Sequence, residues 1–140
     1  MFMLVGDEED DPEVSRLEAS LEIDPDDLRA AMSTQPALYY RARLMSARLE
    51  AALGMAEAEV DAAVNRVAVY LHKQAEDRAE PPTDAQILAR ARQHADVDRA
   101  ARRALETRRR LALARALEGA YEQRARILGI VASLVPGGGR

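Results

Sequence analysis

The sequence has no cysteine and no tryptophan, one phenylalanine and only two histidines. Without cysteine there is neither a disulfide nor a thiolate nucleophile or metal ligand. The histidines, His72 and His94, do not stand at a spacing typical of metal ligands, so we expect no metal and no cofactor. The shortage of aromatic residues also disfavours a β-sandwich or barrel, whose strands alternate aromatic and β-branched side chains.

Long hydrophobic runs are missing as well. No stretch reaches the roughly 18 apolar residues that a membrane span requires, so we expect no membrane association of that kind. The first residues, MFMLVGDEEDD, combine a short apolar run with acids and lack the basic leader of a signal peptide. We therefore expect a cytoplasmic protein, in an infected host cell if a phage encodes it.

Alanine and leucine dominate the 48% of residues that are hydrophobic. This composition favours long helices that pack closely through small side chains, and 140 residues fit one domain. The net charge of −4 hides a gradient along the chain. Residues 1–34 carry eleven acids against two bases, whereas residues 81–140 carry twelve bases against six acids. Such asymmetry is typical of a nucleic-acid-binding face with an acidic arm, although solvated helix faces produce it too.

The expected elements are all helical. Residues 1–20 are acidic and of low complexity, and we expect a disordered arm there. Asp24 and Pro25 open a short helix over residues 25–34, which Pro36 should end. Apolar residues at steps of three and four predict a long helix over 37–79, and the two prolines at 81 and 82 break it.

Thr83 and Gln86 form a capping-box signature for a second long helix, predicted over residues 84–135. Residues 136–140 should form a flexible tail. A helix of about 50 residues would be roughly 75 Å long, which is too long for one small domain. We therefore predict a long antiparallel helical hairpin, preceded by the short helix within a domain of residues 21–135, and assembled into a homo-oligomer.

Six arginines occupy the twelve positions from Arg99 to Arg110. At about 100° per residue, five of them share one helix face with Arg92. Beyond Ala112 the apolar residues move to that same face, which predicts either a break near Arg110 or two halves that bury opposite faces. The stripe comprises Arg92, Arg99, Arg102, Arg103, Arg109 and Arg110. It could follow a phosphate backbone, or it could pair between subunits and across the hairpin with acids such as Glu50, Glu57, Glu59 and Asp61.

The order of the elements resembles the phage UvsY-type recombination mediators. The short helix DLRAAM leads through QPALYYRARL into a long helix that ends in NRVAVYLHKQ. A loop follows, and after it comes the segment TDAQILARA. The final helix carries VDRAARRALE and, later, LEGAYEQRARIL. The resemblance covers roughly residues 22–135. It implies a homo-oligomeric ring of six or seven subunits that binds single-stranded DNA and helps load a RecA-like recombinase onto DNA covered by single-strand-binding protein.

In that family a basic and aromatic segment at the end of the first long helix binds DNA, and the C-terminal helix drives assembly. By resemblance, the DNA-binding role falls on Arg66, Tyr70, His72 and Lys73. Assembly falls, by the same resemblance, on Leu128, Val131 and Leu134. Leu117 and Tyr121 belong to the same apolar face beyond Ala112, which a lone hairpin cannot cover, and we expect them to contribute to assembly as well. This sequence has fewer lysines and aromatics in the DNA segment than the family pattern, which shifts the load toward arginine.

The alternatives remain open at this level. Cations at a helix C-terminus also stabilise the helix dipole, and Tyr39 and Tyr40 could pack between helices instead of stacking on bases. Asp96 and Asp98 do not converge on a helix, and the glycines at 137–139 have no flanking strand or helix, so we expect no enzyme. The other function that we consider is a helical scaffold, adaptor or assembly chaperone that binds protein rather than DNA.

Overall fold

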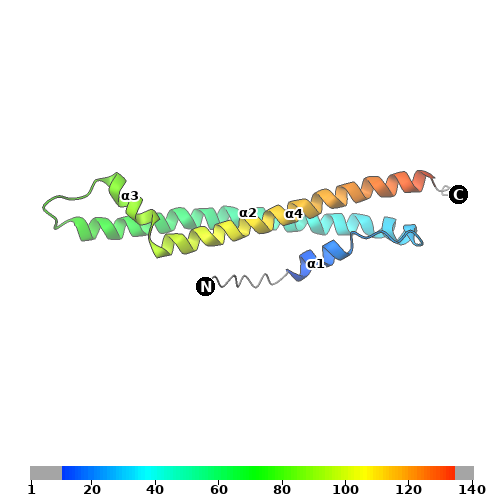
Figure 1. The fold of residues 1–140 in the computed structure, drawn as a ribbon, viewed down its shortest axis with the longest axis horizontal. Helices are drawn as coiled ribbons and strands as arrows, with labels where there is room; N and C mark the ends of the chain where they lie inside the picture. The colour runs from blue at the N-terminus through cyan, green and yellow to red at the C-terminus, as the bar shows by residue number, and fades with distance from the viewer. Residues whose placement is uncertain (1–10, 135–140) are drawn as a thin grey trace, which may run out of the picture. The chain divides into compact units, whose positions relative to one another are not determined.

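The computed structural model describes residues 11–134, and all regular structure in this range is helical (Figure 1). Helix α1 spans Pro12–Ala19, α2 spans Leu28–Ala75, α3 spans Asp84–Arg92 and α4 spans Ala95–Leu134. The predicted all-α class is therefore confirmed for the described residues. The chain divides into two compact units, the first made of Met1–Ala47 with Ala112–Arg140 and the second of Arg48–Leu111.

Helix α1 lies where the sequence predicts a disordered arm. The Asp11 side chain caps it by accepting a hydrogen bond from the Glu13 N–H at 3.1 Å, and Pro12 occupies the first turn. These local signals suit a helix start, and burial of Leu17 adds the tertiary contact that an eight-residue helix needs. The remainder of the predicted arm, residues 1–10, and the predicted tail, residues 136–140, lie outside the described residues.

The predicted stop at Pro36 is wrong, because α2 continues through it. The helix begins later than predicted, with the Asp27 carboxylate accepting from the Ala30 N–H at 3.2 Å. A proline leaves the carbonyl four residues earlier without its backbone donor, here that of Met32. Met32 and Pro36 are both exposed, so water can solvate that carbonyl, while burial of Gln35 holds this turn against α4.

The predicted helix over residues 84–135 is interrupted near its start. The capping box of Thr83 and Gln86 is present, but α3 ends at Arg92. His94 then caps α4, because its Nδ1 accepts from the Asp96 N–H at 3.1 Å. Asp96 also lies in the first turn, where a carboxylate favours the helix dipole. Helix α4 runs without a break through Arg110, where the sequence suggested one.

The buried face of α4 rotates gradually instead of inverting. Buried residues recur along it at intervals of seven, with half-buried Thr107 between the first two members of the first series: Ala100, Ala114, Tyr121 and Leu128 in that series, and Val97, Ala104 and Leu111 in the other. Since a heptad repeat drifts by about 20° per seven residues, the four heptads after Ala100 accumulate about 80°. This drift, together with the width of a buried helix face, accounts for the shift of the apolar residues beyond Ala112. Neither a break in α4 nor a second neighbour on its opposite face is required.

Polar side chains connect the helices of the first unit. Tyr121 is fully buried, its hydroxyl donates to the Leu17 carbonyl at 2.6 Å, and its own carbonyl accepts from Gln35 Nε2 at 2.8 Å. Arg124 is also buried and donates to Gln35 Oε1 and to the carbonyls of Leu21 and Ala31. The carbonyls of Leu17 and Leu21 lie at and after the end of α1, where helix carbonyls lack intrahelical donors. Tyr121 and Arg124 therefore provide the end of α1 with its tertiary hydrogen bonds.

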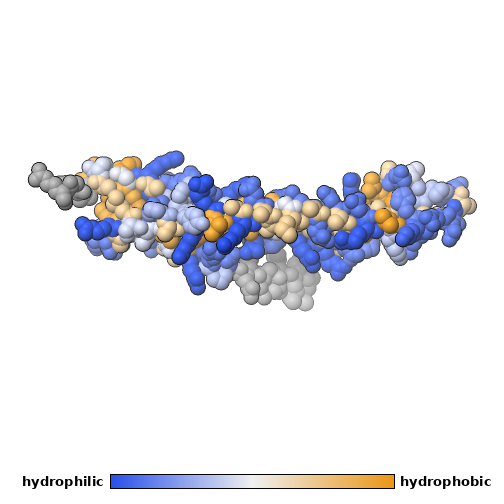
Figure 2. All heavy atoms as spheres, turned by 180° about the vertical axis from the view of Figure 1, so that it is seen from behind, coloured by the Kyte–Doolittle hydropathy of each residue, from blue (hydrophilic) through white to orange (hydrophobic). Residues whose placement is uncertain are grey.

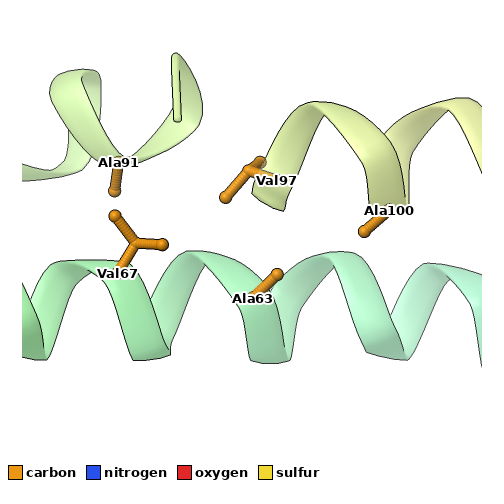
Figure 3. Close-up of a cluster of buried hydrophobic side chains, with 5 residues drawn as sticks. All are labelled: Ala63, Val67, Ala91, Val97 and Ala100. Atoms are coloured by element: carbon orange, nitrogen blue, oxygen red, sulfur yellow. The ribbon is translucent and has the colours of Figure 1, made fainter. Parts of the chain in front are cut away.

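Small side chains form the core of the second unit. Figure 3 shows Ala63 and Val67 of α2 pointing toward Ala91 of α3 and toward Val97 and Ala100 of α4. Alanine and valine bring the helix backbones close together, and their contacts depend on close fit because each side chain has few atoms.

We expect substitution of Ala63 by leucine to destabilise the fold. Three added carbons have no room in this cluster, and overpacking costs about 1–3 kcal/mol of unfolding free energy. The matched control is Ala58→Leu at an exposed position of the same helix, where we expect a change within about 0.5 kcal/mol. Urea denaturation followed by circular dichroism measures both, and equal stabilities would show that α2 is not closely packed at Ala63.

We expect Arg124→Met to reduce the free energy of unfolding by at least about 2 kcal/mol, because buried acceptors would lose their donor. Arg126→Met removes the same kind of side chain from an exposed position two residues later and should have little effect. Parallel urea titrations distinguish the two variants. If Arg124→Met were as stable as Arg126→Met, the buried hydrogen bonds would not stabilise the first unit.

Candidate nucleic-acid interface

Three of the four residues expected to bind DNA at the end of α2 share one side of the helix. At about 100° per residue, Arg66, Tyr70 and Lys73 fall within an arc of about 60°. All three are exposed, Tyr70 at 54%. His72 projects from a different side of α2, where its Nε2 lies 3.5 Å from Oδ1 of Asp84 in α3. The structure therefore groups the other three and separates His72 from them.

The contacts of these three residues differ. Arg66 Nη2 lies 2.9 Å from Oε1 of Glu59, one of the acids expected to pair across the hairpin, but here on the same helix. The Tyr70 hydroxyl accepts a hydrogen bond from Gln74 Nε2 at 2.6 Å. This bond is made at the edge of the half-exposed ring and does not involve its two faces. Lys73 has no ion-pair partner within residues 11–134. Lys73 is thus the cation of this cluster that is most readily offered to a ligand.

The arginine stripe is exposed but loses one member. Arg92 belongs to α3, on the other side of the interruption at Gln93 and His94, and so does not continue the helical face of the others. The remaining members are on α4 and exposed: Arg99, Arg102, Arg103, Arg109 and Arg110.

Acids on α4 itself neutralise part of the stripe. Arg99 pairs with Asp96, Arg102 Nε lies 3.0 Å from Asp98 Oδ2, and Arg109 Nη2 lies 2.9 Å from Glu106 Oε1. The hydrogen bond from Arg109 lowers the pKa of Glu106 below its usual value. Each pair joins residues three or four positions apart on a solvent-exposed surface, where ion pairs contribute little to stability. These arginines can therefore exchange their partner for a phosphate at modest cost.

Pairing between α2 and α4 in this unit involves Arg108, which lies outside the stripe. Its Nη2 is 3.1 Å from Oε1 of Glu57, and the two residues mark one side of the seam between the helices. Arg66, Tyr70 and Lys73 lie about 140–180° around α2 from Glu57. Arg99, Arg103 and Arg110 lie about 140–180° around α4 from Arg108. These six residues consequently share the opposite side of the seam, and we call them the basic face.

The basic face also contains acids. Glu59 and Asp96 lie beside Arg66 and Arg99 as their ion-pair partners. Arg103 has no ion-pair partner in the described part of the chain, as is the case for Lys73. Figure 2 shows one side of the molecule by hydropathy, with hydrophilic residues in blue interrupted by bands of hydrophobic ones in orange. The face is a row of separated cations and not a continuous positive field.

The structure divides the residues predicted to drive assembly. Leu117, Tyr121 and Leu128 are at most 5% exposed and pack within the first unit. Val131 is half-buried, and Leu134 is 74% exposed. Two exposed residues that the sequence reasoning missed, Ile127 and Ile130, stand seven and four positions before Leu134. The helical spacing of Ile127, Ile130 and Leu134 can be recognised in the sequence. Because α1 was not expected, however, the whole apolar face at the end of α4 was assigned to a contact with another subunit.

Tyr39 and Tyr40 have different surroundings. The Tyr39 hydroxyl donates to Glu122 Oε1 at 2.9 Å, and this hydrogen bond is the main reason that the pKa of Tyr39 is raised. The guanidinium of Arg43 lies over its ring, 5.7 Å from the centroid. Tyr40 is 64% exposed. Tyr39 thus fits the predicted packing role, while Tyr40 projects from the helix.

Two further features of the described residues bear on other classes of site. Between Asp11 and Leu134, no three side chains of the types that bind metals lie close enough together to hold an ion. None of the four helices contains a segment sufficiently long and apolar to cross a bilayer.

Comparisons of the chain with family models, with curated proteins and with solved structures give no match.

Proposed function

We propose that this protein is a non-enzymatic, single-stranded-DNA-binding recombination mediator that helps load a RecA-like recombinase onto DNA covered by single-strand-binding protein. The resemblance of its element order to the UvsY-type mediators suggests the class. The observation that carries the binding proposal is the basic face, to which α2 and α4 both contribute cations on one side of their seam. Gln35, near the start of α2, contacts Tyr121 in the later half of α4, and Glu57, farther along α2, contacts Arg108 in the earlier half of α4. This order supports the antiparallel hairpin.

The chemistry of the basic face suits a single strand without sequence preference. Arginine and lysine bind phosphate oxygens, which carry no base information. The half-exposed ring of Tyr70 offers a surface on which any base can stack. Arg103 and Lys73 are available without breaking an ion pair of the described residues, and Arg66 and Arg99 become available by exchanging a carboxylate for a phosphate.

Because acids are interspersed with these cations, one subunit should bind a strand weakly. Several weak sites on one assembly act together, since binding of the first raises the effective concentration of the strand at the next. We propose a homo-oligomer, with a ring of six or seven subunits as the form that the resemblance implies. Ile127, Ile130 and Leu134 supply an exposed apolar stripe for this contact at the end of α4.

A second candidate function follows from the local ion pairs. If Asp96, Asp98 and Glu106 keep their arginines engaged, the second unit presents a mixed-charge surface suited to another protein. The chain would then be a helical scaffold, adaptor or assembly chaperone. DNA binding and its dependence on salt separate the two functions.

We expect the protein to bind a labelled single-stranded oligonucleotide and to lose affinity steeply as salt rises. For single strands, log affinity falls against log salt with a slope of about −0.7 for each phosphate that a cation neutralises. The double variant Lys73→Ala, Arg103→Ala should weaken binding to all sequences alike and flatten the slope by about 0.7 for each phosphate that is no longer neutralised. Fluorescence anisotropy at several salt concentrations measures both quantities.

The matched control is Arg90→Ala with Arg126→Ala, which removes the same charge from two exposed positions outside both the basic face and the arginine stripe. This control should bind nearly as tightly as the original chain. The basic face would be excluded as the DNA site if both double variants lost the same affinity. Absence of binding at low salt would favour the protein-binding scaffold.

We expect Ile130→Asp to reduce the size of the assembly without unfolding the subunit. Ile130 is 60% exposed, so an aspartate there costs little within one chain but would be unpaired in an apolar contact between chains. Met55→Asp, at a still more exposed position on α2, is the control. Sedimentation equilibrium gives the mass and circular dichroism the helix content, and an unchanged mass for Ile130→Asp would contradict assembly through this stripe.

A further inference from the structure

A groove in the first unit lies between α1 and the beginning of α2. Leu17 of α1 and Leu38 and Leu44 of α2 provide its apolar lining, and the exposed ring of Tyr40 forms part of its edge. Leu17 is buried, whereas the described residues cover Leu38 and Leu44 only partly. The groove therefore offers apolar surface to a partner.

The charges that line this groove balance one another. Asp11 and Glu13, at the start of α1, are matched by Arg16 of α1 and Arg41 of α2, so two acids and two bases leave the lining without net charge. A surface with a large net charge of either sign would meet like charges here without an excess of opposite ones. The groove therefore suits an apolar occupant that carries little charge.

The chain carries a helix face of this kind at the end of α4. Ile127, Ile130 and Leu134 are exposed and stand at positions i, i+3 and i+7, the spacing with which a helix places anchors in an apolar groove. They fall within an arc of about 60° around the helix, and we call them the C-terminal stripe. The charged residues of this part of α4 are Arg124, which is buried, and Arg126, which lies about 70° from the centre of the arc. The C-terminal stripe is thus an apolar surface without a charge of its own.

We propose that the C-terminal stripe of a second copy of this chain binds in the groove between α1 and α2. Its three side chains would cover Leu38 and Leu44, which one copy alone covers only partly. This inference rests on the assembly through the stripe that the proposed function includes, and it names the surface that receives the stripe. It does not depend on DNA binding.

The lengths of the two surfaces agree. From Ile127 to Leu134 the C-terminal stripe extends along about 10 Å of helix. The α2 wall of the groove runs from Ala37 to Leu44, which is the same number of residues and so the same length. The opposite wall is the eight-residue α1, about 12 Å long. All three side chains of the stripe can therefore contact the groove at once.

The C-terminal stripe cannot reach the groove of its own chain. Tyr39, in the part of α2 that borders the groove, donates to Glu122 of α4, and Arg43 pairs with Glu118 at 3.5 Å. Residue numbers in α2 and α4 thus increase in opposite directions, so α4 passes beyond the groove after Glu122. Because α4 remains helical to Leu134, the stripe lies about 7–18 Å farther along the helix.

The groove and the C-terminal stripe are different surfaces, so their contact is heterologous. Each copy would use its stripe toward one neighbour and its groove toward the other, which closes into a ring when the rotation between copies allows it. A ring of more than two subunits requires a contact of this kind. A stripe that paired with the stripe of another copy would stop at two subunits.

The test uses two variants of the full chain that each remove one surface. Ile130→Asp disrupts the C-terminal stripe, and the double variant Ala37→Glu, Tyr40→Glu places charges in the groove at two exposed positions. We expect sedimentation equilibrium to show single subunits for each variant, with the helix content unchanged by circular dichroism. An equimolar mixture should form pairs and nothing larger, because one intact stripe then meets one intact groove. The control Ala51→Glu, Met55→Glu, exposed on α2 outside the groove, should keep the original mass.

The outcomes separate this contact from the proposed function. An unchanged mass for Ile130→Asp would contradict assembly through the stripe, and this contact with it. Dissociation of Ile130→Asp together with an unchanged mass for the groove variant would overturn only the groove as the receiving surface. A mixture that stays monomeric would overturn it as well.

Cross-linking gives a second readout, because the sequence has no cysteine. Ile130→Cys stands near the middle of the stripe and Tyr40→Cys near the middle of the α2 wall, so the two positions meet whichever way the helix lies in the groove. With a short bismaleimide, and a tag on one chain to distinguish mixed dimers by size, we expect the mixture to give mainly the mixed dimer. Replacing Tyr40→Cys by Met55→Cys is the control and should lower that yield severalfold. Equal yields with both, or dimers of Ile130→Cys alone, would overturn the proposal.

Discussion

Burial of Tyr121 and Arg124 is the constraint on which the first unit depends. Both side chains have polar atoms that must be satisfied where water is excluded, and α1, the α1–α2 connection and α2 provide the partners. An apolar contact alone would allow α1 to slide along its neighbours. Hydrogen bonds to the carbonyls of Leu17 and Leu21 fix its end, and the groove beside it is thereby given defined walls.

This arrangement also determines which part of α4 remains exposed. Tyr121, which contacts Leu17 of α1, and Leu128 are both buried, so the large apolar side chains left exposed at the end of α4 are the narrower stripe of Ile127, Ile130 and Leu134. From the sequence, the whole C-terminal face was assigned to assembly on the resemblance and on the shift of the apolar residues beyond Ala112, and residues 1–20 were expected to be disordered and so to cover none of it. The presence of α1 therefore changes the proposed subunit contact as well as the fold of the chain's beginning.

The sequence was sufficient for the all-helical class and for signals that act locally. The Thr83 capping box and the period of the apolar residues in α2 depend on side chains a few positions apart, which can be recognised without a structure. Continuation of α2 through Pro36 could not be recognised in this way, because it depends on Gln35 reaching a carbonyl 86 residues away. The break before α4 was missed for a different reason: His94 acts there as a cap, although histidine is not among the residues usually preferred at that position.

The basic face shows the same difference between pattern and structure. Periodicity correctly placed the α4 arginines on an exposed face, but it could not show which acids would engage them. In the structure the acids are mostly neighbours on the same helix, so the charges are partly balanced within each short stretch. A ligand with many regularly spaced phosphates can displace these carboxylates one at a time, each at a small cost, whereas a single phosphate gains too little to do so. If the proposed function is right, a surface of this kind favours a long strand held by several subunits over any short anion, so that assembly and DNA binding would be coupled.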